Sequence, residues 1–147
     1  MVTAADTSFL FSLYGNDAHS GKAVAWLEQH SQPISLNRLN EFELGNALRF
    51  AEFKSFLGKG KAETYWSDFL EDLRKGHVCR VSSNLARVLE EAIKLSASRT
   101  LKSGHRSFDI LHVAGAVVMG AGIFLTFDQN QARLASSVGL NVPEGLL

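Results

Sequence analysis

The chain has 147 residues, of which 46% are hydrophobic and two are proline, a composition typical of one folded domain spanning residues 1–147 and not of a disordered chain. Lysine and arginine together number 15, as do aspartate and glutamate, so overall charge gives no indication of a nucleic-acid partner. The single cysteine, Cys79, excludes an intramolecular disulfide and a cysteine-rich zinc site.

The N-terminal segment has no basic stretch ahead of an apolar one and carries Asp6, so it does not resemble a signal peptide. The apolar run at residues 110–127 has the length of a membrane-spanning helix. However, it contains His112 and a glycine break at residues 120–122, and aspartates flank it on both sides. We therefore expect a cytoplasmic protein with no membrane contact.

Short apolar runs that favour strands alternate with amphipathic helical patterns along the chain. The first half predicts strands at residues 2–5 and 33–36, with helices at 7–14, 18–30 and 37–53. The second half predicts strands at residues 78–81, 123–127 and 140–142, with helices at 62–75, 85–95, 109–119 and 131–138. The expected helix caps include Thr7 or Ser8 and Asn37 or Asn40.

Strands that alternate with helices need crossover connections, which produce a parallel sheet covered on both faces. The pattern therefore predicts an α/β fold with three layers, α/β/α, around a central, mostly parallel sheet of five strands. In such folds, the carboxyl ends of the strands and the amino ends of the helices meet at one edge, where functional sites form.

Acidic residues gather at that edge. Asp6 ends the first strand, Asp128 ends the strand at residues 123–127, and Asp109 begins the helix between them. The helix at residues 37–53 supplies Glu41 and Glu43, which lie about 200° apart around the helix axis, so only one of the two can face the edge. We favour Glu43, because its face continues toward residues 46, 47 and 50.

Converging carboxylates without an intervening lysine or arginine stay ionised together when a divalent cation compensates their charge. Oxygen ligands with no cysteine or histidine cluster favour Mg²⁺ or Mn²⁺, and such sites commonly act on phosphates. Taken alone, each acid is better explained as a helix cap, a turn residue or a solvated charge. Their joint placement favours a shared site.

Four segments then carry a family resemblance. Asp6 ends the first strand, residues 43–48 have the pattern Glu-x-x-Asn-Ala-Leu, residues 106–114 are Arg-Ser-Phe-Asp-Ile-Leu-His-Val-Ala, and residues 125–131 have the pattern Leu-Thr-Phe-Asp-x-x-Gln. In this order and at these separations, the segments resemble the PIN-domain nucleases, and among them the VapC-like ribonuclease toxins of bacterial toxin–antitoxin pairs. The resemblance covers essentially the whole chain.

The resemblance implies a catalytic and metal-binding site formed by Asp6, Glu43, Asp109 and Asp128. The implied activity is endonucleolytic hydrolysis of RNA by a water activated by Mg²⁺ or Mn²⁺. The implied partners are an antitoxin protein and a second copy of the chain, in a homodimer.

Other residues are expected to support this site. Those expected to orient the acids are Thr7, Asn46, Thr126 and His112. For His112, a proton shuttle or phosphate contact is possible, but packing under the sheet with backbone hydrogen bonds is the favoured interpretation. Gln131 fits either a supporting amide or an exposed surface amide. The expected RNA contacts are Arg106 above all, with Arg38, Arg49 and Lys102.

Other phosphate-handling families lack their motifs here. The glycines at residues 120–122 precede an expected strand and not a helix, and residues 58–61 form no Walker A motif. Ser8 stands where a haloacid-dehalogenase-type phosphatase needs a second aspartate, and no lysine suits a receiver domain. The remaining alternative is a catalytically silent PIN-fold module that binds a protein or RNA partner, against which the presence of all four acids argues.

Overall fold

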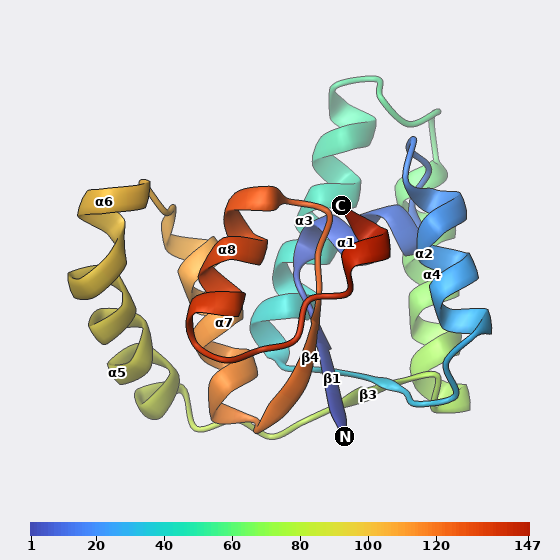
Figure 1. Ribbon diagram of the computed structural model, residues 1–147. Helices are drawn as coiled ribbons and strands as arrows, with labels where there is room; N and C mark the ends of the chain where they lie inside the picture. The colour runs from blue at the N-terminus through green and yellow to red at the C-terminus, as the bar shows by residue number, and fades with distance from the viewer.

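The computed structural model describes residues 1–147 and has a four-stranded sheet at its centre (Figure 1). The strands are β1 (Val2–Ala5), β2 (Ile34–Leu36), β3 (Val78–Arg80) and β4 (Ala121–Leu125). They lie in the order β3-β2-β1-β4, and every neighbouring pair is parallel. The predicted α/β class with a parallel sheet is therefore confirmed.

The fifth strand predicted at residues 140–142 does not form. Asn141 makes one isolated bridge with Ile123, through two backbone hydrogen bonds of 2.9 Å. Gly139, with a positive φ of 89°, turns the chain just before this segment, and Pro143 follows it without a backbone N–H to donate. The segment between the two is too short to add a strand.

Helices cover both faces of the sheet, with α1 to α4 on one side and α5 to α8 on the other (Figure 1). The first group comprises α1 (Thr7–Tyr14), α2 (Ser20–Glu28), α3 (Arg38–Phe53) and α4 (Lys61–Lys75). The second comprises α5 (Leu85–Leu95), the π-helical turn η1 (Ser96–Thr100), α6 (Leu101–Ser103), α7 (Ser107–Val118) and α8 (Gln129–Ser137). A short 3₁₀ helix, η2 (Glu144–Leu146), ends the chain.

Each helical layer buries its own hydrophobic cluster against the sheet. On the first side, Phe9 of α1 and Phe69 of α4 are fully buried together with Leu125 of β4. On the second side, Val113 of α7 packs with Phe124 of β4. The neighbouring residues Phe124 and Leu125 enter opposite clusters because successive strand side chains point to opposite faces. The predicted three-layer arrangement is confirmed.

The structure identifies the caps of α1 and α3. Asp6, and not Thr7 or Ser8, caps α1 by accepting a hydrogen bond from the Phe9 amide. At α3, Asn37 is the cap, and the Asn40 side-chain oxygen accepts a hydrogen bond from the Asn37 backbone amide, which completes a capping box.

Between β3 and β4 the helical structure extends further than predicted. α7 begins at Ser107, two residues before the expected start at Asp109. The helix after Asn84, which was expected to end at residue 95, continues through η1 and α6 as far as Ser103. No helix of the chain is long and apolar enough to cross a membrane, because α7 ends at Val118 before the glycine break.

The strand order reverses at β1. From β1 the chain proceeds to β2 and β3 on one side, and it returns to β4 on the other. In α/β sheets, a crevice opens outside the carboxyl ends of the two strands at such a switch point. β1 runs directly into Asp6, and Asp128 follows β4 after two residues, so both acids lie at this position.

Candidate active site

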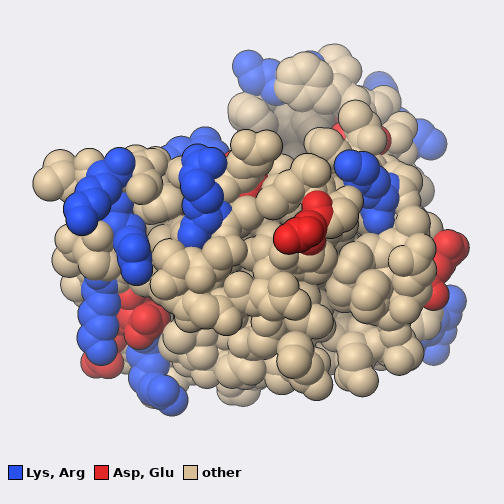
Figure 2. Space-filling view, viewed as in Figure 1, with Lys and Arg blue, Asp and Glu red and all other residues tan.

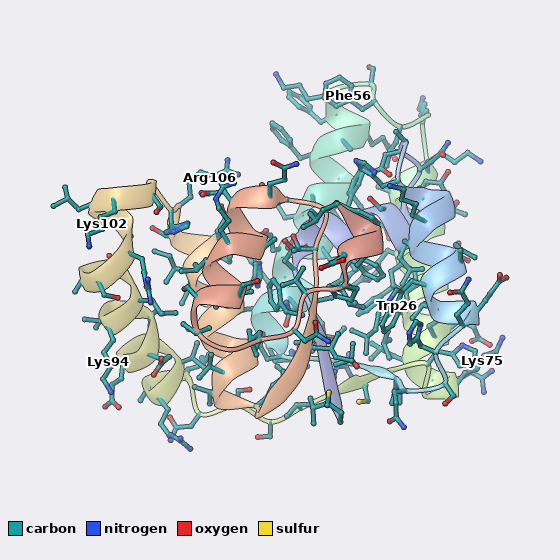
Figure 3. All side chains as sticks on the ribbon, in the orientation of Figure 1. Trp26, Phe56, Lys75, Lys94, Lys102 and Arg106 are labelled. Carbon is teal, nitrogen blue, oxygen red and sulfur yellow. The ribbon has the colours of Figure 1, made fainter.

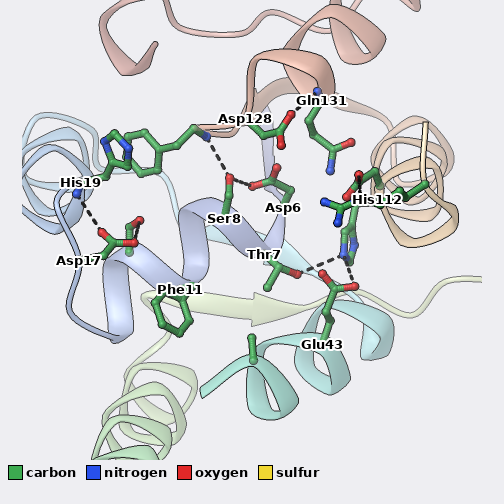
Figure 4. A pocket seen from close by; sticks show the side chains of 15 residues that line it. Asp6, Thr7, Ser8, Phe11, Asp17, His19, Glu43, His112, Asp128 and Gln131 are labelled. Atoms are coloured by element: carbon green, nitrogen blue, oxygen red, sulfur yellow. Dashed lines mark hydrogen bonds and ion pairs between the residues drawn. The ribbon is translucent and has the colours of Figure 1, made fainter. Parts of the chain in front are cut away.

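A cavity of about 410 Å³ lies at the carboxyl ends of β1 and β4, and we call it the acidic cavity (Figure 4). Its lining includes all four predicted acids: Asp6 after β1, Glu43 from α3, Asp109 from α7 and Asp128 before α8. The helical-wheel preference for Glu43 is correct, because Glu41 lines a different cavity on the other face of α3.

Asp6 is the most deeply placed of the four acids, with 1% of its surface exposed. One carboxylate oxygen accepts hydrogen bonds from the Ser8 hydroxyl at 2.7 Å and the Phe9 amide at 3.0 Å. The other oxygen accepts from the Thr126 hydroxyl. All three donors are neutral groups. Burial raises the pKa of the Asp6 carboxyl, although these hydrogen bonds act in the opposite direction.

Thr126 and Ser8 link the ends of β1 and β4 around this carboxylate. The Thr126 hydroxyl oxygen accepts a hydrogen bond from the Asp128 amide at 3.0 Å, and the Ser8 hydroxyl accepts one from the Phe127 amide at 3.0 Å. Asp128 in turn caps α8, because its carboxylate accepts from the Gln131 amide at 2.8 Å. The Thr126 hydroxyl therefore contacts both acids, Asp6 through its carboxylate and Asp128 through its backbone amide.

Glu43 is held on the opposite wall of the cavity by His112 (Figure 4). The His112 Nε2 atom lies 3.3 Å from the Glu43 carboxylate and 3.2 Å from the Thr7 hydroxyl. The Asn40 amide nitrogen, which also donates to the Ala5 carbonyl, lies 3.2 Å from His112 Nδ1. This places the lone pair of a neutral His112 on Nδ1 and the proton on Nε2, from which it is donated toward Glu43.

His112 is 4% exposed and lies under the sheet edge, as the favoured interpretation expected. Its ring partners, however, are the side chains of Asn40, Thr7 and Glu43, where backbone hydrogen bonds were expected. Burial raises the pKa of Glu43, but the hydrogen bonds from His112 and Thr7 and the charges of His112 and Arg106 outweigh it, so the pKa lies below its usual value.

The predicted basic residues divide between several places. Arg106 lines the acidic cavity, where its Nε atom lies 3.3 Å from the Asp109 carboxylate. Lys102 is exposed on α6 and does not line the cavity. It lies at the outer edge of the molecule, beside α6 (Figure 3). Lysine and arginine side chains are frequent on that side of the face drawn in Figure 2. Arg38 and Arg49 line the cavity on the other face of α3.

Asn46 does not reach Glu43. It is exposed and lines the same cavity as Arg38 and Arg49. The position that the prediction gave to Asn46 is filled by Asn40, which supports Glu43 through His112. Gly115 allows α7 to lie close to the start of α3, because a Cβ atom there would come within 2.8 Å of the Asn37 side-chain nitrogen.

The cavity lining includes two further polar residues, one that was not predicted and one whose exposure the sequence left open. Ser8 was not among the predicted supporting residues, although its spacing of two from Asp6 is typical of a local side-chain hydrogen bond. Gln131 is 2% exposed, which excludes the interpretation as a surface amide. It lines the acidic cavity, and its buried Oε1 atom has no hydrogen-bond partner.

The donor set of the acidic cavity is suited to a hard cation. The oxygen atoms of Asp6 are buried among neutral donors, and the Gln131 Oε1 atom lacks a partner, so both would gain from a positive charge. In this structure no three acidic, histidine or cysteine side chains meet closely enough to share one ion. Glu43 and Asp109 instead face His112 and Arg106.

Comparison with known proteins identifies the family. The profile of the PIN domain matches residues 4–136, which include all four acids and their supporting hydroxyl groups. The chain belongs to the PIN domain family. The family predicted from the sequence is thereby confirmed. No curated protein matches this PIN domain in sequence.

Solved structures share the fold of this PIN domain. The crystal structure of PAE2754 from Pyrobaculum aerophilum superposes with a TM-score of 0.65 at 18% sequence identity, covering 99% of this chain and 86% of that one. The crystal structure of FitAcB from Neisseria gonorrhoeae gives a TM-score of 0.63 at 16% identity, covering 98% of both chains. At these identities the likeness concerns the fold.

Proposed function

We propose that this PIN domain is a metal-dependent endoribonuclease whose catalytic and metal-binding residues are Asp6, Glu43, Asp109 and Asp128. The observation that carries the proposal is the acidic cavity at the β1/β4 switch point, in which Asp6 is buried with neutral donors only. A buried carboxylate without a cationic partner is unfavourable, and a divalent cation would relieve it.

The four carboxylates would hold Mg²⁺ or Mn²⁺, with the free Gln131 Oε1 as a further oxygen at the same cavity. The bound cation would supply a water of lowered pKa and a positive charge beside the scissile phosphate.

The remaining polar groups of the cavity orient these carboxylates. Thr126 and Ser8 fix the orientation of Asp6, and His112 fixes that of Glu43 through the proton on Nε2. Because Asn40 occupies His112 Nδ1, the ring is fixed in one tautomer and serves as a hydrogen-bond donor. Arg106, exposed at the entrance, is suited to contact a phosphate of the substrate.

We further propose that the chain acts as a single domain and as the toxin of a toxin–antitoxin pair in the cytoplasm, with an antitoxin protein and a second copy of the chain as partners. The support is the VapC-like sequence resemblance together with family membership over residues 4–136. The alternative, a silent PIN-fold module, would need the acids only as structural groups. Of these, Asp6 and Asp128 do cap helices, whereas Glu43 and Asp109 cap none.

The deciding experiment uses purified protein, a mixed RNA substrate and added Mg²⁺, Mn²⁺ or EDTA. We expect cleavage only with the metal, loss of cleavage in Asp6→Asn, and normal cleavage in Asp72→Asn, an acid on α4 that accepts a hydrogen bond from Tyr14 far from the cavity lining. Metal binding is followed separately by the rise in Tm on adding Mn²⁺. No cleavage and no Tm shift in the wild type would overturn the proposal in favour of the silent module.

A further inference from the structure

A second cavity, of about 340 Å³, lies on the other face of α3, and we call it the arginine cavity. It is lined by Arg38, Glu41, Phe42, Asn46, Arg49, Trp66 and Arg80. It shares no residue with the acidic cavity. Three of its seven lining residues are arginines, which makes it a candidate for anion binding in a chain of zero formal charge.

Glu41 anchors two of these arginines from below. It is 6% exposed, and its carboxylate accepts a hydrogen bond from Arg80 Nε at 2.7 Å while Arg38 Nε lies 3.0 Å from the other oxygen. No other ion pair or hydrogen bond engages either guanidinium group. Because both contacts use Nε, the Nη groups of the two arginines remain free to donate outward.

The third arginine is held in a different way. The Arg49 guanidinium lies 5.5 Å from the centre of the Trp66 ring, and its Nε atom is 3.3 Å from the exposed carboxylate of Glu63. Stacking on an aromatic ring leaves the edge of a guanidinium free for hydrogen bonds. The guanidinium groups of Arg80 and Arg49 are therefore restricted before any ligand binds, which reduces the entropy lost on binding. The exposed Arg38 adds a third positive charge, which lies beside a Glu41 oxygen that has no hydrogen-bond partner.

An aromatic ridge connects this cavity with the acidic one. Phe42, which lines the arginine cavity and is 65% exposed, stacks on Phe108 with ring centres 6.3 Å apart. Phe108 lies 6.0 Å from the ring of His112, which lines the acidic cavity. An exposed aromatic ring beside arginines is the arrangement with which proteins bind single-stranded nucleic acid, whose bases stack on the ring.

We propose that the arginine cavity binds the phosphate backbone of single-stranded RNA beside the scissile position, with Phe42 stacking on a base between the two cavities. This inference rests on the proposed ribonuclease function for the choice of RNA. Arg38 and Arg80 donate to phosphate oxygens through their free Nη groups, and Glu41 keeps the two guanidinium groups in position. One helix, α3, thus carries a proposed ligand of the acidic cavity on one face and Arg38, one of the two phosphate contacts, on the other, while Arg80 comes from the end of β3.

RNA fits these observations better than an acidic peptide would. Both ligands would satisfy the arginines, but only a nucleic acid uses the exposed face of Phe42 for base stacking. The placement of both cavities on α3 also favours a chain long enough to occupy them together.

The test measures binding of a labelled single-stranded RNA by fluorescence anisotropy in EDTA, over a series of salt concentrations. We expect Arg38→Gln/Arg80→Gln to weaken binding about tenfold and to reduce the salt slope by about 1.4, since each single-strand phosphate contact contributes about 0.7. Phe42→Ala should weaken binding of the single strand about tenfold and that of an RNA duplex much less. An unchanged salt slope in the double variant would overturn the inference.

Glu41→Gln gives the sharpest comparison, with Glu71→Gln as its control. Both substitutions remove one negative charge from a glutamate paired with arginine, but Glu71 and Arg74 lie on the exposed surface of α4. If net charge alone governs affinity, both variants bind RNA as well as the wild type or better. If Glu41 holds the arginines in place, Glu41→Gln weakens binding at least about threefold while Glu71→Gln does not. Equal behaviour of the two would reject the anchored site.

Because binding is measured in EDTA, its outcome is separate from that of cleavage. Loss of affinity in the arginine variants, in a protein that cleaves no RNA with any metal, would leave the binding site valid and reject the nuclease. Metal-dependent cleavage with unchanged affinity in these variants would support the nuclease and reject the arginine cavity as an RNA-binding site.

Discussion

Asp6 and Glu41 are both buried carboxylates, yet their surroundings differ completely. Asp6 accepts hydrogen bonds from two hydroxyl groups and one amide, all neutral. Glu41 lies between Arg38 and Arg80, whose charges compensate its own. The difference supports the proposal that a bound cation compensates Asp6 and not Glu41. In the acidic cavity, the hydrogen-bond donors to Asp6 are all neutral. In the arginine cavity, two arginines already contact Glu41.

The same contrast separates Glu43 from Glu41, two residues apart on one helix. Glu43 faces the single imidazole of His112, and Glu41 faces two guanidinium groups. A single hydrogen-bond donor orients a carboxylate and would leave it available to a metal ion. An arginine pair removes that availability. The distinction can be tested by replacing the acids with amides, by removing a hydroxyl group that orients them, or by changing the pH.

Replacing each buried acid with its amide should give the largest difference between the two cavities. We expect Asp6→Asn to lower the cleavage rate about a thousandfold, because an amide cannot neutralise a cation. Glu41→Gln should keep the cleavage of a dinucleotide within about threefold, because so small a substrate makes few contacts outside the acidic cavity. Steady-state kinetics in Mg²⁺ measure both, and similar losses would abolish the distinction.

Removing a neutral donor should have an intermediate effect. Thr126→Val deletes the hydroxyl that donates to Asp6 and accepts from the Asp128 amide, and we expect kcat to fall about ten- to a hundredfold. Thr126→Ser retains the hydroxyl and should recover most of the activity. If serine and valine behave alike, the hydroxyl group does not position these acids.

Stability should respond in opposite directions to the two amide substitutions. Burial raises the pKa of Asp6, so its charge opposes folding at neutral pH, and Asp6→Asn should stabilise the metal-free protein by about 1 kcal/mol. Glu41→Gln leaves two arginines without a counter-charge and should destabilise it by about 1–2 kcal/mol. Urea unfolding in EDTA measures both values, and a common sign would contradict the comparison.

The smallest expected effect is a pH dependence at Glu43. Its folded-state pKa is below the usual value, so its interactions add stability above pH about 4.3, and this contribution is lost as the pH falls through the lower folded pKa. His112→Gln should remove part of this dependence, because His112 is the main hydrogen-bond partner that lowers the pKa. Chemical unfolding between pH 3 and pH 6 follows it; identical profiles for the two proteins would exclude His112 as the cause.

Much of the fold follows from patterns that lie within single elements. The alternation of strands and helices gave the three layers, and the angle between Glu41 and Glu43 showed that only one of them can face the acidic cavity. Thr126 was found because it directly precedes the turn to Asp128. Each of these inferences needs only the order of the chain and the geometry of one helix or strand.

The errors arise where a second element decides. Asn40 and Asn46 lie three residues before and after Glu43, about 60° from it in opposite directions around the helix. Periodicity does not tell on which of these sides α7 packs, and His112 of α7 selects Asn40. The burial of Gln131 likewise depends on the closing of the cavity around the start of α8.

Asp6 and Asp128 each cap a helix with the same carboxylate that the acidic cavity uses. This double use limits which residues can replace the two aspartates during evolution. A lineage that loses cleavage cannot exchange these aspartates freely, since most replacements would also unravel the first turn of α1 or α8. Asparagine, serine and threonine keep a cap without a charge. Relatives that have become inactive should therefore carry one of these residues at each of the two positions, and a survey of sequences could separate active from inactive descendants by that substitution alone.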